Sequence, residues 1–145
     1  MIANITRGKD FGGLARYLTR PPERVAWTYT HNLSSEDPQR IVHAMRYAAS
    51  ASRARQPVYH LSVRWDDHDR PTRAQMLETA ERVLAGLQLS RHQTLVVAHN
   101  DSSVPHLHLM VNLVHPRAGT IANTWQDKPR TMAVLRALER EHGWR

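Results

Sequence analysis

The chain has 145 residues, no cysteine and a formal net charge of +7 at pH 7. Disulfides and thiolate metal sites are therefore excluded, and any metal would be held by nitrogen and oxygen atoms. No apolar run is long enough to span a bilayer and the N-terminus lacks a signal-peptide pattern, so we expect a cytoplasmic protein without membrane insertion. Most of the positive charge is arginine, which suits bidentate phosphate contacts and favours a nucleic-acid partner.

Strand-like and helix-like segments alternate along the sequence. An alternating stretch predicts a first strand over residues 1–6, and a short helix follows over residues 11–19 until Pro21 and Pro22 end it. Further strands are predicted over residues 25–30, 58–65, 95–98, 104–114 and 120–123. Further helices are predicted at approximately residues 35–53, 72–87 and 130–142.

This order of elements predicts an α+β fold. We expect a largely antiparallel central sheet with helices packed on one face, which leaves the other face open for substrate. The length suits one core, and no repeat, low-complexity tract or linker interrupts the chain. Residues 1–145 are therefore expected to form a single domain.

The stretch from His99 to Asn112 carries the clearest chemical signal. Side chains alternate along a strand, so His106 and His108 share one face while leucines occupy the other. In an antiparallel hairpin, His99 would lie across from this pair. Three neutral imidazoles with open positions are typical of a catalytic metal site, and Asp101 is placed to orient a ring. The alternative is an exposed polar strand face.

The strand over residues 58–65 has a similar polar face, formed by His60, Ser62 and Arg64. We therefore expect this strand to lie beside the strand of His106 and to share its surface.

Three segments together resemble the motifs of conjugative plasmid relaxases, the mobilisation nucleases of the HUH endonuclease superfamily. These segments are residues 13–19, residues 59–63, and His99-x-Asp101 followed by residues 106–116. Residues 138–143 are similar to the helix that closes the nuclease domain in relatives of the IncP plasmid type.

The resemblance implies an HUH-nuclease fold and a metal-dependent DNA-nicking reaction. Tyr17 matches the nucleophile that attacks a phosphodiester at an origin of transfer, leaving a 3′-hydroxyl and a 5′-phosphotyrosyl link. His99, His106 and His108 match the ligands of one divalent ion, expected to be Mg²⁺ or Mn²⁺. Asp101 matches the acidic residue of the catalytic group and would orient an imidazole.

The resemblance also implies contacts between the middle motif and DNA. Relatives have a serine at the position of Arg64, so either Ser62 or Arg64 is expected to take that role. Arg16 and Asn112 are further expected DNA contacts.

The implied partner is single-stranded DNA at an origin of transfer in the bacterial cytoplasm, with accessory relaxosome proteins and a type IV secretion coupling protein. We expect a monomeric nuclease domain without a C-terminal helicase or primase region. Three alternatives stay open: a rolling-circle replication initiator, a catalytically silent binder of single-stranded nucleic acid, and a hydrolase whose metal activates water while Tyr17 only packs.

Overall fold

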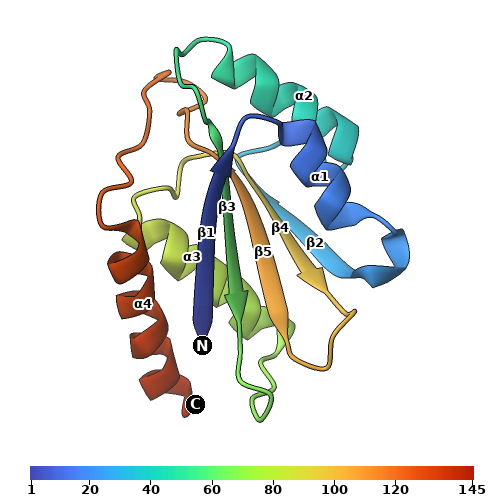
Figure 1. The fold of residues 1–145 in the computed structure, drawn as a ribbon, viewed down its shortest axis with the longest axis vertical. Coiled ribbons are helices and arrows are strands. Elements are labelled where there is room, and N and C mark those ends of the chain that lie inside the picture. The colour runs from blue at the N-terminus through green and yellow to red at the C-terminus, as the bar shows by residue number, and fades with distance from the viewer.

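The computed structural model describes residues 1–145 and contains a five-stranded sheet and four α-helices (Figure 1). The strands are β1 (Ile2–Gly8), β2 (Val25–His31), β3 (Val58–Arg64), β4 (Thr94–His99) and β5 (His106–Asn112). The helices are α1 (Phe11–Thr19), α2 (Pro38–Ala49), α3 (Arg73–Gly86) and α4 (Asp127–His142), and a 3-10 helix covers Pro22–Arg24. None of the helices combines the length and the apolar character that a membrane span requires.

The sheet has the strand order β1-β3-β5-β4-β2, and every neighbouring pair is antiparallel. The predicted α+β fold with an antiparallel sheet is therefore confirmed. β4 and β5 form the predicted hairpin, and β3 lies beside β5 as its polar face indicated. The strand predicted over residues 120–123 is reduced to one bridge between Val114 and Ile121. β5 is the central strand, so side chains on it are held from both sides.

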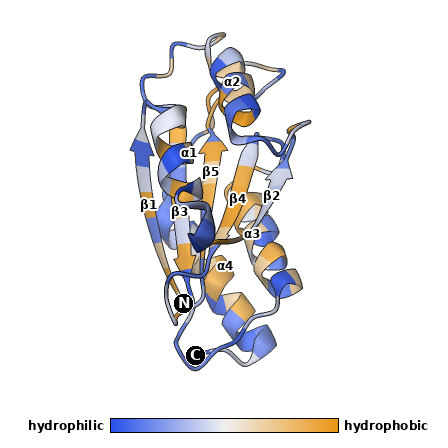
Figure 2. Ribbon diagram, turned by 90° about the vertical axis from the view of Figure 1, so that its right-hand side faces the viewer, coloured by the Kyte–Doolittle hydropathy of each residue, from blue (hydrophilic) through white to orange (hydrophobic).

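One face of the sheet packs against α3 and α4. Alternate strand residues such as Leu61 and Leu109 are fully buried there, together with Leu84 of α3 and Leu138 of α4. Figure 2 shows the hydrophobic strands β4 and β5 at the centre of the sheet. Burying each such side chain contributes about 1.5–3 kcal/mol, so this core fixes the frame on which the other face is built.

The second face is covered by α1 and α2 over only part of its area. Phe11 and Leu18 of α1 pack with Met45 of α2 against Val97 and Met110 of the sheet. The expectation of helices on one face alone therefore needs correction, because these sheet positions are apolar and the amphipathic α1 buries its own stripe against them. The rest of this face, along β1, β3 and one end of β5, has no helix over it (Figure 1).

Candidate metal centre and nucleophile

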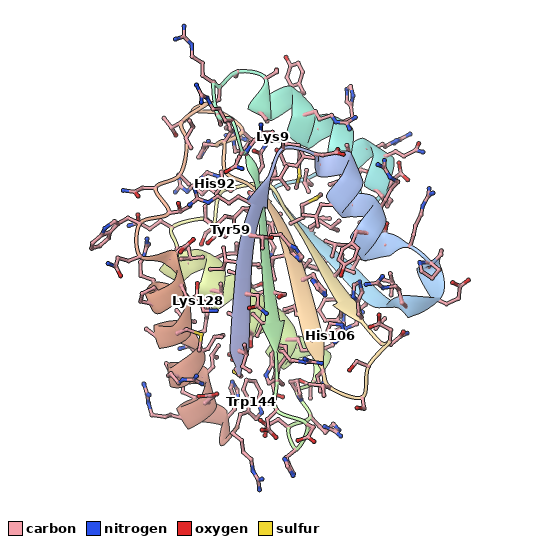
Figure 3. All side chains as sticks on the ribbon, in the orientation of Figure 1. Lys9, Tyr59, His92, His106, Lys128 and Trp144 are labelled. Atoms are coloured by element: carbon pink, nitrogen blue, oxygen red, sulfur yellow. The ribbon has the colours of Figure 1, made fainter.

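The structure brings the three predicted histidines together at the hairpin end of β4 and β5. His99 pairs with His106 in the register of the two strands, and His108 lies two residues further along the same face of β5. One ring nitrogen from each histidine lies within 4.8 Å of the others. The ring centroids of His99 and His108 are 4.5 Å apart. Figure 3 shows His106 near this end of β5.

Each of the three rings has one nitrogen in an outer hydrogen bond. Nε2 of His99 donates to the Leu18 carbonyl at 2.6 Å, and Nδ1 of His106 donates to the Val104 carbonyl at 3.0 Å. Nδ1 of His108 lies 2.9 Å from Nε2 of His60. Outer bonds of this kind fix the orientation and the tautomer of a ligating imidazole. Nε2 of His106 and Nε2 of His108 are left for a ligand, and Nδ1 of His99 is the second nitrogen of its ring, which accepts a hydrogen bond from Arg24.

The local environment keeps imidazoles of this cluster neutral. Burial, together with the neighbouring imidazoles of His99 and His60, lowers the pKa of His108 to about 3. Burial is also the main cause that lowers the pKa of His99 and that of His60. A neutral imidazole offers a lone pair, so these rings are in the form that binds a metal at pH 7.

This donor set fits a divalent cation. Nε2 of His106 lies 3.3 Å from Oδ1 of Asp101. A cation held by the three imidazoles would therefore lie beside this carboxylate, which would balance part of its charge.

Arg24 joins the histidine cluster to Tyr17. Its Nη2 donates to Nδ1 of His99 at 3.2 Å, and its Nε lies 3.4 Å from Oδ2 of Asp101. Its guanidinium carbon lies over the Tyr17 ring, 5.2 Å from the centroid. Arg24 was not predicted from the sequence, because nothing in its local sequence distinguishes it from the other arginines of the chain.

Tyr17 is presented to solvent beside this cluster. It lies on α1, its side chain is 57% exposed, and its hydroxyl has no hydrogen-bond partner. The next residue, Leu18, is buried and supplies the carbonyl that orients His99. The same helix turn therefore places an accessible phenol and fixes one ring of the cluster.

Ser62 and Arg64 both face the histidines from β3. In the register with β5, Ser62 lies opposite His108 and Arg64 opposite His106. Arg64 is exposed and Ser62 is half-buried. His60, two residues before Ser62, was predicted to lie on this face but not to contact His108. Only the strand register brings these two rings together.

Asn112 shares the face of His108 but is inaccessible, so the expected DNA contact does not fit its position. Its Nδ2 donates to the Met45 carbonyl at 3.1 Å and to Oε1 of Gln93 at 3.0 Å, while its Oδ1 accepts from the Val114 amide at 3.0 Å. The side chain is fully buried beneath α2. Asn112 therefore ties the end of β5 to its neighbours.

Arg16 lies on another side of α1 from Tyr17, about 100° around the helix. It is exposed and lines a groove of about 800 Å³ between α1 and α2, together with Arg20 and Arg46. The acidic Glu36 also lines this groove.

A three-histidine centre on an antiparallel sheet, with an exposed tyrosine on the first helix, is the arrangement expected of an HUH-type nuclease. The family model described as "Relaxase: MobA/VirD2-like, nuclease domain" matches residues 17–144. The chain belongs to this family. It is thus a relaxase nuclease domain of the MobA/VirD2-like type.

Curated relatives agree with this assignment. Protein TraI of Escherichia coli is 27% identical over 140 residues, which are 92% of this chain and 19% of TraI. Protein MobA of Acidithiobacillus ferrooxidans is 26% identical over 96 residues, 65% of this chain and 24% of MobA. The chain thus matches about a fifth of the length of TraI and about a quarter of that of MobA.

The similar solved structure is described as "Molecular Basis of Vancomycin Resistance Transfer in Staphylococcus aureus". It has a TM-score of 0.67 and covers 99% of this chain and 95% of its own. The sequence identity is 8%, so this likeness shows a shared fold.

Proposed function

We propose that this domain nicks one DNA strand at an origin of transfer with Tyr17 as nucleophile. The Tyr17 hydroxyl loses its proton as its oxygen forms a bond to phosphorus, the bond from phosphorus to the 3′-oxygen breaks, and the 3′-oxygen takes up a proton. The products are a 3′-hydroxyl and a 5′-phosphotyrosyl link, which keeps the phosphodiester energy for religation. The observation that supports this most directly is the exposed phenol of Tyr17 one residue before the carbonyl that holds His99.

The three histidines would hold one divalent ion through Nδ1 of His99 and Nε2 of His106 and His108. When bound, such an ion polarises the non-bridging phosphate oxygens. Of the two expected ions, Mn²⁺ suits this nitrogen-rich set better, because Mg²⁺ prefers oxygen ligands. Asp101 would balance the charge of Arg24 and lie beside the ion, next to Nε2 of His106.

Arg24 would assist Tyr17 directly. Its guanidinium lies over the phenol ring, where a cation stabilises negative charge that develops on the oxygen. Arg64 and Ser62 would contact the backbone of the strand beside the nick, because both side chains lie on the open face next to the histidines. Arg64 is the better placed of the two for phosphate, since it is exposed and permanently charged.

The substrate would be single-stranded DNA in the bacterial cytoplasm. Accessory relaxosome proteins and a type IV secretion coupling protein would then act with the nicked complex, as the relationship to TraI and MobA suggests.

A denaturing gel tests the proposed reaction. The protein is incubated with Mn²⁺ and labelled single-stranded oligonucleotides from its own genetic neighbourhood, beside Tyr17→Phe and Tyr47→Phe. Tyr47 is a matched control, because it is 78% exposed on α2, away from the histidines. We expect label to migrate with the wild-type protein and with Tyr47→Phe, but not with Tyr17→Phe. Cleaved, unattached label in all three lanes would instead indicate water activated by a metal.

A further inference from the structure

The groove between α1 and α2 contains two arginines that face the same point of the α1 backbone. A Cβ atom added to Gly12 would lie 2.8 Å from Nη2 of Arg46 and 3.5 Å from Nη1 of Arg16. Gly12 is buried, whereas both arginines are exposed. Two guanidiniums from different helices therefore converge at a position where the backbone has no side chain to separate them. We call Arg16 and Arg46 the arginine pair.

Only part of the positive charge of the arginine pair is balanced. Oδ1 of Asp10 lies 3.6 Å from Nη2 of Arg46, and both side chains are mostly exposed. Exposed ion pairs contribute little to stability, so an incoming anion can replace Asp10. The acidic residues that line the groove, Glu36 and Asp37, precede α2, and Asp37 is nine residues before Arg46, roughly 14 Å along the helix axis. Planar guanidiniums with this surplus charge suit a phosphate group.

The arginine pair lies on the helix of Tyr17. Successive residues of an α-helix are 100° apart, so Arg16 is turned about 100° from Tyr17 in one direction and the buried Leu18 about 100° in the other. The surface from Tyr17 toward Arg16 therefore leads away from the sheet, across the exposed side of α1. Gly12 is five residues before Tyr17, about 7.5 Å along the axis. A strand attached to the Tyr17 oxygen would reach the arginine pair by this surface.

The groove and the open face of the sheet lie on opposite sides of the histidine cluster. The strand order places β4 and β5, which hold the three histidines, between β3 and β2. Ser62 and Arg64 lie on β3. Val25 and Thr28 of β2 line the groove. Figure 1 shows β1 and β3 on one side of β5, and β2 on the other. The protein thus has two separate surfaces that lead away from the scissile phosphate.

The proposed reaction assigns a different strand to each surface. In phosphoryl transfer the attacking and leaving oxygens are roughly in line, so the 3′-oxygen leaves on the side of phosphorus opposite the Tyr17 oxygen. The strand that ends in this 3′-hydroxyl would therefore lie away from α1, over β3. The strand on the 3′ side of the nick stays attached to Tyr17 through its 5′-phosphate, so it begins at α1.

We propose that Arg16 and Arg46 together bind one backbone phosphate of the strand that Tyr17 retains after the nick. The proposal rests on the nicking function and adds a site that holds its covalent product. The arginine pair would keep the attached strand on α1 until religation.

Binding of one-sided oligonucleotides tests this. All variants carry Tyr17→Phe to prevent cleavage. The double variant combines Arg16→Gln with Arg46→Gln. The control combines Arg140→Gln with Arg145→Gln, which removes the same charge from exposed positions outside the groove. Fluorescence anisotropy compares two probes built on the oligonucleotide that forms the adduct in the gel: the 3′ probe has about ten nucleotides on the 3′ side of the nick and about two on the 5′ side, and the 5′ probe has the reverse.

We expect the double variant to bind the 3′ probe about tenfold more weakly than the control does at about 0.1 M salt, because charge-assisted hydrogen bonds to phosphate are strong. The slope of log K against log salt should become shallower by about 0.7, the contribution of one single-strand phosphate. Both proteins should bind the 5′ probe equally. Equal binding of the 3′ probe, or a loss confined to the 5′ probe, would overturn the proposal.

Single substitutions test whether the two arginines share one phosphate. Residues that hold the same group are not additive, so Arg16→Gln and Arg46→Gln should each cause most of the loss seen in the double variant. Two independent losses that add up would overturn the shared site. Both positions are exposed, so we expect the variants to fold normally, and urea denaturation checks this.

The failure of this site and the failure of the nicking function give different results. Absence of any adduct with the wild-type protein overturns the nicking function, and the assignment of the arginine pair with it. A normal wild-type adduct, together with equal binding of the 3′ probe by the double variant and the control, overturns only the arginine pair.

Discussion

Nε2 of His60 lies 2.9 Å from Nδ1 of His108, diagonally across the paired strands β3 and β5. The two rings are stacked with their centroids 5.1 Å apart. When Nε2 of His108 faces a metal, its Nδ1–H donates to His60, so His60 sets the orientation of this ring.

We expect His60→Ala to weaken binding of Mn²⁺ by about ten- to a hundredfold, as is typical when the outer partner of a ligating histidine is lost. Isothermal titration calorimetry without DNA measures this. His60→Gln keeps an acceptor and should recover part of the affinity, and His43→Ala, at an exposed position on α2, should change nothing. Unchanged metal affinity in His60→Ala would show that His108 needs no outer partner.

Arg24 competes with a metal for the same nitrogen of His99. Its Nη2 donates to Nδ1, the atom that a metal would use, and its positive charge repels a divalent ion. We expect Arg24→Met to tighten metal binding by about tenfold in calorimetry and to slow formation of the covalent adduct, because Tyr17 loses its cation. Arg20→Met, at an exposed neighbouring position, serves as the control. Looser metal binding in Arg24→Met would contradict this interpretation.

The buried imidazoles make the metal-free protein less stable in acid. Histidine in an unfolded chain has a pKa of about 6.5, whereas burial lowers the pKa of His108 to about 3. The unfolded chain therefore binds more protons between these values, and the free energy of unfolding falls as the pH decreases from 6.5 toward 3. The contribution of His108 has a limiting slope of about 1.4 kcal/mol per pH unit.

Urea denaturation in EDTA at several pH values between 7.5 and 4.5 measures this dependence. His108→Asn should flatten the curve relative to the wild-type protein, while His43→Ala should run parallel to it. A His108→Asn curve that is parallel to the wild type would show that His108 is protonated equally in both states.

Asn112 is a structural residue, and we expect Asn112→Ala to lower the free energy of unfolding by about 2–4 kcal/mol. The substitution leaves the Met45 carbonyl and the Val114 amide without their partners in a buried environment. Chemical denaturation measures this loss, with the exposed Asn123→Ala as the control. The folded fraction of Asn112→Ala should still bind DNA normally. Loss of DNA affinity without loss of stability would restore the expected DNA contact.

The sequence predicts those parts of the site that depend on local periodicity. His106 and His108 alternate with leucines, and a short polar loop brings His99 back beside them, so their proximity follows from strand geometry alone. Asn112 follows the same alternation, yet α2 covers it. The position of a helix on a sheet is decided by packing between distant segments, and the alternation of residues along one strand carries no information about that packing.

Arg24 and His60 illustrate a second limit. Their roles come from contacts between segments that are distant in the sequence. Arg24 contacts His99 and the Tyr17 ring, and His60 contacts His108 across a strand register. A shift of one residue in that register would turn His60 to the opposite face. The presence of helices on both faces of the sheet was missed for a similar reason. The apolar stripe of α1 predicts that this helix is buried, but it does not specify which face of the sheet the helix packs against.

The hydrogen bond from His99 to the Leu18 carbonyl links α1 mechanically to β4. Any local opening that lifts the end of α1 from the sheet breaks this bond and releases the His99 ring to rotate. An ion that fixes His99 therefore also makes such opening rarer, and the linkage is reciprocal. Amide hydrogen exchange at the end of α1 thus becomes a reporter of metal occupancy 81 residues away in the sequence.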